Sequence, residues 1–168
     1  ERRVRELPVH AHVVLEHVEG PSLGRLVRRH GALSIEQLIP LALQLAAVLH
    51  YVAADGFVHL DVKPGNVVMG VPPRLIDLGI ARPIEAAAKL RDAIGTDAYM
   101  APEQCAPARF PGLVGPPADV WGLGATLFQQ ADQLVKLPSF RHYNSPTTQL
   151  FRHARSTRRW PLVAGVAS

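Results

Sequence analysis

The sequence predicts an α+β fold that is mainly helical, with a few short β-strands between the helices. Three observations predict it. A capping signal at Ser34 opens a long helical pattern, short apolar pieces separated by Pro and Gly follow Gly56, and helical periodicity returns over residues 118–131. The 168 residues are 48% hydrophobic and 19% charged, which is typical of a chain that buries one compact core.

Two helices are expected in the first third of the chain. Ser22, after the Gly20-Pro21 turn, opens a short helix over residues 23–30. Ser34 and Gln37 form a capping box that begins the next helix, which runs to Gly56. Its apolar residues follow the helical period on one face (38, 41, 42, 45, 49 and 52) and cover much of the other (39, 43, 46 and 47). We therefore expect a central helix that is buried on nearly all sides.

Short strands are expected on both sides of this helix. Residues 12–18 are rich in β-branched side chains and end in a turn, so they predict a strand. The pieces 57–59, 67–69 and 75–76 predict small strands joined by loops. Residues 118–131 then predict a second buried helix with apolar positions at 120, 123, 127 and 128. Its two glycines, 122 and 124, are expected to permit close packing.

Charge divides the chain into two parts. Residues 1–132 carry 12 Lys and Arg against 14 Asp and Glu, whereas residues 133–168 carry six basic side chains and no acidic one. We expect one domain over 1–131 and a poorly ordered basic tail, rich in Pro and Arg, over 132–168. A nucleic-acid or membrane-binding patch is the alternative for the tail. Its aromatic residues are too widely spaced for base stacking, so no nucleic-acid partner is expected.

The compartment is predicted from what the sequence does not contain. Cys105 is the single cysteine, so no internal disulfide can form. No basic leader precedes an apolar segment, and the apolar stretch 39–54 is interrupted by Gln44 and His50. We expect a cytoplasmic chain without a membrane span.

Polar, reactive side chains collect in the loops after Gly56. The sequence reads His59-Leu-Asp61-Val-Lys63-Pro-Gly-Asn66, then Asp77-Leu-Gly, then Gly95-Thr96-Asp-Ala-Tyr-Met-Ala-Pro-Glu103. Each residue alone has an ordinary explanation as a turn former or a solvated charge. Together, and in this order, they resemble the catalytic loop, the magnesium-binding triplet and the end of the activation segment of protein kinases. The chain is similar to the C-terminal lobe of a serine/threonine protein kinase of the bacterial, eukaryotic-like type.

The resemblance implies a protein-kinase-like fold with a mainly helical C-lobe, short β-hairpins and one or two hinge strands. It also implies ATP as phosphate donor, Mg²⁺, and Ser or Thr hydroxyls of protein substrates as acceptors. The implied catalytic residues are Asp61, Lys63, Asn66 and Thr96, and the implied metal ligands are Asn66 and Asp77. The implied nucleotide-binding set adds the hinge residues Leu15, Glu16 and Val18 to Lys63, Asn66 and Asp77.

Other matched positions are implied to be structural. His59 packs under the magnesium triplet, and Asp119 holds the catalytic loop through backbone amides. Glu103 anchors the activation segment, although its arginine partner cannot be placed in this sequence.

The sequence departs from the family pattern in two ways. A glycine-rich loop, the phosphate-binding lysine and its glutamate are not found, and only eleven residues precede His12. We expect an incomplete domain with little activity alone: a fragment, a truncated product or a partner-dependent remnant. Leu60 replaces the family's arginine, and residues 80–94 contain no Ser, Thr or Tyr, so no phosphorylation switch is expected there. The alternative function is a non-catalytic kinase-like binding or regulatory module.

Overall fold

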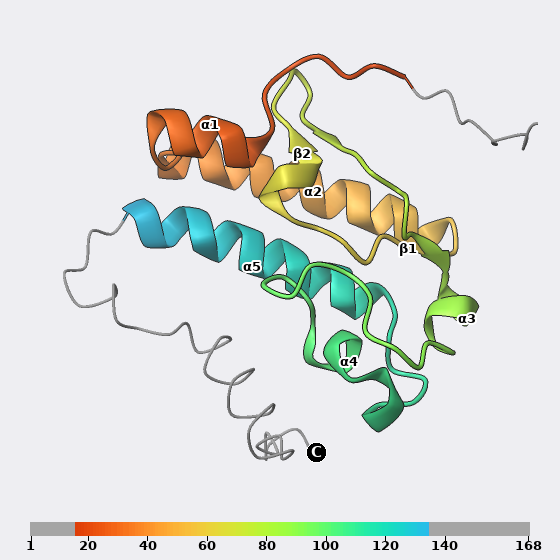
Figure 1. The fold of residues 1–168 in the computed structure, drawn as a ribbon. Coiled ribbons are helices and arrows are strands. Elements are labelled where there is room, and N and C mark those ends of the chain that lie inside the picture. The colour runs from red at the N-terminus through yellow and green to blue at the C-terminus, as the bar shows by residue number, and fades with distance from the viewer. Residues whose placement is uncertain (1–15, 135–168) are drawn as a thin grey trace, which may run out of the picture.

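The computed structural model describes residues 16–134, with side chains described as far as Gln130. Two long helices, α2 and α5, lie side by side, and the short strands and small helices gather along them (Figure 1). The mainly helical α+β class is confirmed. In chain order the elements are α1 (Leu23–His30), α2 (Ile35–Ala54), β1 (Phe57–Val58), η1 (Pro64–Asn66), β2 (Val67–Val68), β3 (Arg74–Leu75), β4 (Arg82–Pro83), α3 (Ile84–Ala87), α4 (Pro102–Cys105), η2 (Pro107–Arg109) and α5 (Pro116–Leu134).

The starts of α1 and α2 follow from local hydrogen bonds. Ser22 Oγ accepts from the backbone N–H of Arg25 at 3.3 Å, which satisfies one of the free amides at the start of α1. The N–H of Ser34 donates to Gln37 Oε1 at 3.0 Å, which is the return bond of the capping box. The predicted range of the first helix and the predicted start of the second are confirmed.

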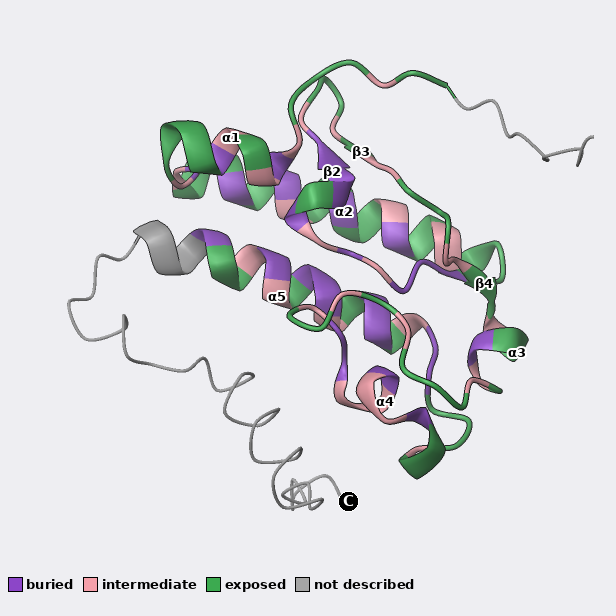
Figure 2. Cartoon of the chain, viewed as in Figure 1, coloured by how far each residue is buried: buried purple, intermediate pink, exposed green. Residues whose placement is uncertain are grey.

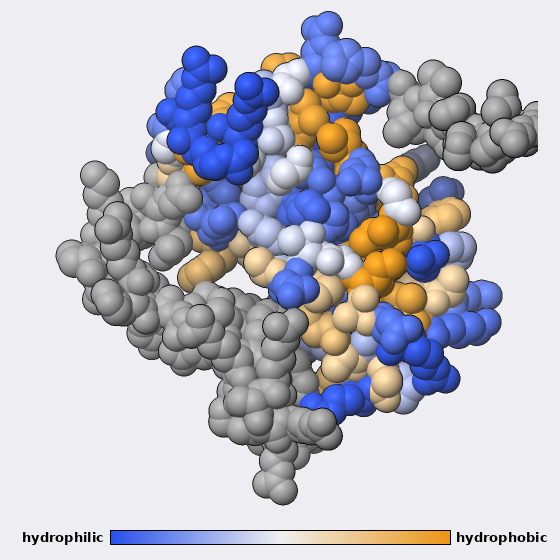
Figure 3. Space-filling view, viewed as in Figure 1, coloured by the Kyte–Doolittle hydropathy of each residue, from blue (hydrophilic) through white to orange (hydrophobic). Residues whose placement is uncertain are grey.

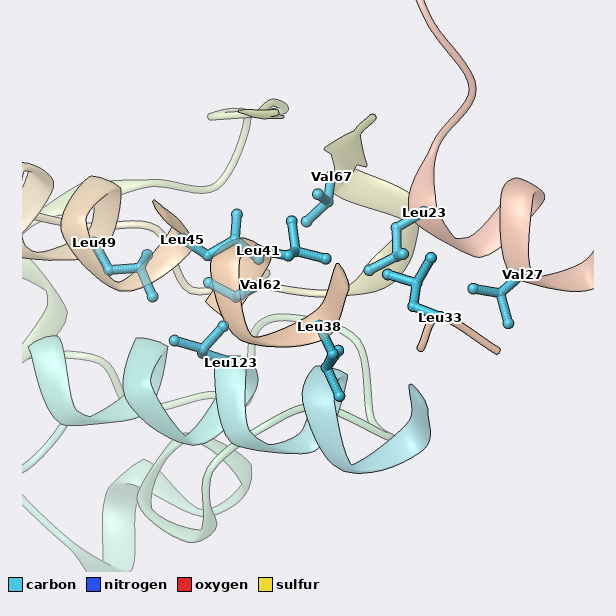
Figure 4. Packing of buried hydrophobic residues seen from close by; sticks show 10 residues of the cluster. All are labelled: Leu23, Val27, Leu33, Leu38, Leu41, Leu45, Leu49, Val62, Val67 and Leu123. Atoms are coloured by element: carbon cyan, nitrogen blue, oxygen red, sulfur yellow. The ribbon is translucent and has the colours of Figure 1, made fainter. Parts of the chain in front are cut away.

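One face of α2 forms the main core. Its four leucines at 38, 41, 45 and 49 face Leu123 of α5 and the side chains of Val62 and Val67 (Figure 4). Fully burying such a side chain contributes about 1.5–3 kcal/mol. Because Val62 and Val67 belong to this core, they anchor both ends of the segment that carries Lys63 and Asn66.

The opposite face of α2 is exposed. Ile35, Ile39 and Leu43 keep 54%, 54% and 67% of their accessible surface, and green, exposed segments alternate with purple, buried ones along α2 in Figure 2. The prediction of a helix buried on nearly all sides is therefore wrong, because only its leucine face meets other described elements. By length and composition α2 could cross a membrane. That is weak evidence for a span, since the leucine face packs into the core.

Helix α5 confirms the predicted periodicity only in part. Val120 and Phe128, which were expected to be buried, are 64% and 48% exposed. A Cβ on Gly122 would lie 3.0 Å from Val62 O, so close packing at this glycine is confirmed. A Cβ on Gly124 would have no neighbour within 4 Å, so the same expectation for Gly124 is wrong.

The strands form two antiparallel pairs of two residues each. β1 pairs with β4 and β2 pairs with β3, with Val67 opposite Leu75. Three of these strands were predicted, β1 and β2 one residue too long and β3 shifted by one residue, whereas β4, α3 and α4 were not. Residues 16–18 are irregular, so the strand predicted over 12–18 is wrong there, and residues 12–15 lie outside the described range.

Candidate active site

Four of the predicted site residues meet around the carboxylate of Asp61. Thr96 Oγ1 donates to Oδ1 at 2.7 Å, and Lys63 Nζ donates to Oδ2 at 2.7 Å. Asn66 Nδ2 donates to the same Oδ2 at 3.0 Å and to the Asp61 carbonyl oxygen at 2.9 Å. The structure thus brings together side chains from two loops that are about thirty residues apart in the sequence.

These contacts determine the charge of Asp61. Burial alone would raise its pKa, but the hydrogen bonds from Lys63 and Thr96, the positive charge of Lys63 and the bond from Asn66 outweigh burial. The pKa of Asp61 therefore lies below the ordinary value of an aspartate. At neutral pH the group is a carboxylate, which accepts hydrogen bonds and does not donate them.

Lys63 links Asp61 to Thr96. Its ammonium group also donates to Thr96 Oγ1 at 2.7 Å, which closes a triangle of three hydrogen bonds. An ammonium carries three N–H donors, and two are used here. The third is available to an anionic group that approaches Asp61.

The backbone at Leu60 is held in an uncommon conformation beside this triangle. Its φ angle is +67°, a region that costs a bulky L-residue about 1–2 kcal/mol. Its N–H donates to Asp119 Oδ1 at 2.7 Å, and its carbonyl accepts from Gln104 Nε2 at 2.6 Å. The backbone N–H and the backbone C=O of Leu60 are therefore both hydrogen-bonded to side chains from distant elements. These two bonds hold the turn that presents Asp61.

His59 is a structural neighbour of the site. It is fully buried, and its Nδ1 accepts from the N–H of Asp61 at 3.3 Å while Nε2 lies 3.2 Å from the carbonyl oxygen of Ile76. Both contacts suit one neutral tautomer with the proton on Nε2. The imidazole thereby joins the loop of Asp61 to the residue that precedes Asp77.

Asp119 is a buried carboxylate with two backbone donors, the N–H groups of His59 and Leu60, each at 2.7 Å. Burial raises its pKa, and the two amide hydrogen bonds offset part of that increase. Because Asp119 lies in the first turn of α5, it joins the loop of Asp61 to the helix that packs against α2.

Asp77 lies next to Asn66 through the β2–β3 pairing. The N–H of Ile76 donates to the Asn66 carbonyl at 2.8 Å. The next residue, Asp77, therefore follows directly after a residue that is hydrogen-bonded to Asn66. Asp77 is exposed, its φ is +69°, and within the described part of the chain its carboxylate accepts one hydrogen bond, from the N–H of Gly79 at 3.3 Å. Since both Nδ2 bonds of Asn66 go to Asp61, its Oδ1 is left as a ligand atom, and the Asp77 carboxylate is likewise available.

These two oxygen donors fit Mg²⁺, which is bound by few protein carboxylates or amides and completes its shell with water and phosphate. The described residues contain no group of three or more His, Cys, Asp or Glu that could hold a metal. A metal held by Asn66 and Asp77 would take its other ligands from water and phosphate oxygens.

The predicted hinge residues are not brought to this cluster. Leu15 lies outside the described residues, and no hydrogen bond joins described residues Glu16 or Val18 to the Asp61 group. Glu16 Oε2 lies 3.8 Å from Arg74 Nη1 in an exposed pair that contributes little stability. Glu103 has no ion pair among the described residues, so its predicted anchoring role has no observed partner.

Sequence reasoning missed Gln104. This side chain is 2% exposed, and its Nε2 donates to the carbonyls of Leu60 and Ile94, at 2.6 and 2.5 Å. A Cβ on Gly95, whose φ is +128°, would lie 2.5 Å from that Nε2 and 2.8 Å from Leu60 O. No local pattern could have identified the Gln104 contacts, because one partner is 44 positions away.

Comparison with known proteins agrees with this geometry. The family model described as protein kinase domain matches residues 2–161, which includes much of the segment predicted to be a separate tail. The chain is 40% identical over 114 residues to a probable serine/threonine-protein kinase, PkwA, of Thermomonospora curvata, and 66% of the chain is covered. It is 35% identical over 137 residues to serine/threonine-protein kinase PkaA of Streptomyces coelicolor, with 76% of the chain covered.

A third relative is serine/threonine-protein kinase PknA of Mycobacterium tuberculosis, at 32% identity over 123 residues and 71% of the chain. The matched regions span 15%, 24% and 28% of these three relatives' own lengths. The similarity therefore concerns one part of each relative.

Proposed function

The chain belongs to the protein kinase domain family, and from this premise we propose that it is the catalytic-loop portion of a serine/threonine protein kinase. The reaction is transfer of the γ-phosphoryl group of ATP to a Ser or Thr hydroxyl of a protein, in the cytoplasm. The observation that carries the proposal is the closed triangle of Asp61, Lys63 and Thr96.

Asp61 orients the acceptor hydroxyl. As a carboxylate with a lowered pKa, it accepts the hydroxyl proton as a hydrogen bond and directs the oxygen lone pair toward phosphorus. A bond forms between that oxygen and the γ-phosphorus, and the bond from phosphorus to the β,γ-bridging oxygen breaks. ADP leaves, and the hydroxyl proton passes to Asp61 or to a phosphoryl oxygen. A weakly basic carboxylate suits such a reaction, in which positioning contributes most of the rate.

Lys63 provides the positive charge next to the acceptor. Its remaining N–H can bond an oxygen of the transferring phosphoryl group while the other two hold Asp61 and Thr96. Thr96 fixes the distance between the two charged groups, because its hydroxyl accepts from one and donates to the other. Acceptor orientation and charge neutralisation therefore depend on the same three side chains.

Asn66 and Asp77 are the proposed Mg²⁺ ligands, and the metal neutralises phosphate charge when it is bound. Asn66 has a second task, since its amide fixes Asp61 from the opposite side to Thr96. The backbone of Leu15, Glu16 and Val18 is proposed to bind the adenine edge, and the support for this is the family resemblance alone.

The test is transfer of labelled γ-phosphate to a generic Ser- and Thr-containing protein by the natural protein that carries this chain. We expect turnover in the kinase range of roughly 1–100 s⁻¹. Asp61→Asn should remove most of it, and Lys89→Ala, at an exposed position away from the site, should not change it. Nucleotide binding without transfer would contradict the proposal and favour a non-catalytic binding module.

A further inference from the structure

A pocket next to the Asp61 cluster is not used by the proposed reaction. Its volume is about 240 Å³, and it lies between α1, η1, the segment after Thr96 and the end of α5. This is below the roughly 300 Å³ at which pockets begin to hold drug-sized ligands, so its size suits one amino-acid side chain. The lining residues used below are Arg28, Lys63, Gly65, Tyr99, Gln129 and Gln130.

The pocket lies within reach of a substrate peptide. Lys63 lines it and also donates to the Asp61 carboxylate. Tyr99 lines it too, and its N–H donates to the Thr96 carbonyl at 2.8 Å. An extended peptide advances about 3.3–3.6 Å per residue. A chain that presents a hydroxyl to Asp61 therefore places a side chain only a few residues away at this pocket.

The charge of the lining is positive. No lining residue is an Asp or Glu. Lys63 is already paired with Asp61 at 2.7 Å, whereas Arg28 makes no ion pair among the described residues. A Cβ on Gly24 would lie 3.5 Å from Arg28 Nη1 and 3.5 Å from Pro64 Cβ, so the guanidinium lies over the wall of the pocket.

The surrounding surface has the same sign. α1 contains three arginines and one histidine and no acidic residue. Figure 3 shows strongly hydrophilic side chains gathered over this helix, at the upper left of the molecule. The remaining polar groups of the pocket are neutral, and Gly65 contributes no side chain.

Gln130 adds a buried polar side chain to the lining. Gln130 lines the pocket and is 1% exposed, yet its Oε1 has no hydrogen-bond partner among the described residues. A buried acceptor without a donor costs about 1–3 kcal/mol. The neighbouring Gln129 is not free, because its Oε1 accepts from Tyr99 OH at 2.7 Å.

We propose that this pocket selects substrates, and that Arg28 receives an acidic side chain located a few residues from the phosphorylated Ser or Thr. A carboxylate fits the planar guanidinium through two parallel hydrogen bonds. An Arg or Lys at the same substrate position meets a like charge with no carboxylate in the lining to receive it. The selection of phosphorylated substrates rests on the proposed function. The binding of an acidic peptide at Arg28 does not.

The test compares peptides that share one Thr and differ by a Glu or a Lys at each of the four positions on either side. The natural protein that carries this chain should prefer Glu at one or two of these positions by about three- to tenfold in kcat/KM, the size expected of a partly exposed charge pair. Arg28→Glu should reverse the preference. Arg29→Glu is the matched control, since Arg29 is exposed, lies in the same helical turn and does not line the pocket.

Peptide affinity measured by fluorescence anisotropy separates this inference from the proposed function. If peptides with Glu bind more tightly, if Arg28→Glu reverses this, and if no phosphate is transferred, the proposed role of the pocket is supported and the proposed kinase activity is rejected. Transfer that proceeds with the same Glu-to-Lys ratio in both proteins would reject the pocket and keep the activity. Thermal melting of Arg28→Glu identifies a folding defect, and in that case Arg28→Gln, which removes the charge alone, should abolish the preference.

Discussion

The carboxylate of Asp119 and the backbone of Leu60 are joined by a 2.7 Å hydrogen bond, although the two residues are 59 positions apart in the sequence. The same carboxylate accepts from the N–H of His59, also at 2.7 Å. Leu60 has a φ of +67°, so the conformation that presents Asp61 is not one that the residue favours by itself. The loop keeps its shape because Asp119 accepts from its amides.

Asp119→Ala should therefore destabilise the fold by about 2–4 kcal/mol, because it leaves two buried N–H groups without an acceptor. The variant also no longer buries a charged carboxylate, which is itself unfavourable. The net decrease in the free energy of unfolding is therefore smaller than the loss of the two hydrogen bonds alone. Urea denaturation of the wild-type and variant proteins measures the difference. A loss below about 0.5 kcal/mol would show that another group holds the loop.

Gly95→Ala should destabilise more than Gly31→Ala. Both glycines have positive φ, at +128° and +87°, so both substitutions carry backbone strain of about 1–3 kcal/mol. A Cβ on Gly31 meets nothing within 4 Å, whereas a Cβ on Gly95 meets Gln104 Nε2 at 2.5 Å. Gly95→Ala must displace Gln104 and should also lower the phosphorylation rate. Equal effects on the free energy of unfolding would contradict the proposed close contact.

Asp61→Asn and Asp77→Asn should each reduce the transfer rate by at least about two orders of magnitude, with little change in melting temperature. The first variant lacks the carboxylate for the acceptor hydroxyl, and the second lacks the charge that binds the metal. Raising the Mg²⁺ concentration should partly restore Asp77→Asn but not Asp61→Asn. If added Mg²⁺ restored both equally, or neither, the two assigned roles would not be distinct.

Lys63→Met should raise the pKa of Asp61. In the wild type, burial raises this pKa and the contacts with Lys63, Thr96 and Asn66 lower it further than burial raises it. A lowered pKa means that ionised Asp61 stabilises the fold above the unfolded-state value of 3.8, and that this stabilisation is lost as pH falls through the folded-state pKa. Lys63→Met removes a hydrogen bond and a positive charge that lower the pKa of Asp61, and it leaves the opposing effect of burial in place.

Carbon-13 NMR of the Asp61 carboxyl measures the change in pKa directly. Lys89→Met, at an exposed position, is the control and should leave the Asp61 titration where it is. An unchanged titration in Lys63→Met would show that the 2.7 Å contact does not persist in solution.

The activity of the natural protein should not depend on phosphorylation within residues 80–94, which contain no Ser, Thr or Tyr. Leu60 is 2% exposed and packs in a cluster with Ile80, Ile84 and Ile94, so apolar contacts hold this segment where a phosphate and an arginine could otherwise do so. Phosphatase treatment should leave the rate unchanged. Thr96→Ala should lower it, and Thr96→Ser, which keeps the hydroxyl, should not.

A phosphate found on Thr96 by mass spectrometry, together with loss of activity after phosphatase, would overturn this expectation. Leu60→Arg is a second check. It places a charge among apolar side chains, so it should destabilise the protein and should not create phosphate dependence.

Features that depend on groups a few residues apart could be predicted from the sequence alone. Ser22, Ser34 and Gln37 predicted where α1 and α2 begin, because a cap is a bond between groups no more than three positions apart. The order and spacing of the polar motifs indicated the family, and the structure brings Asp61, Lys63, Asn66 and Thr96 into one hydrogen-bonded group. Their catalytic roles stay predictions.

Long-range contacts determine which apolar faces are covered and how the loop of Asp61 is held. The sequence of α2 is apolar on both faces, and its packing against α5, Val62 and Val67 determines that the leucine row is buried while Ile39 and Leu43 stay exposed. The bonds from Asp119 and Gln104 to Leu60 span 59 and 44 positions. No local pattern encodes such contacts, because a backbone amide is the same at every residue and the fold alone selects which side chain reaches it.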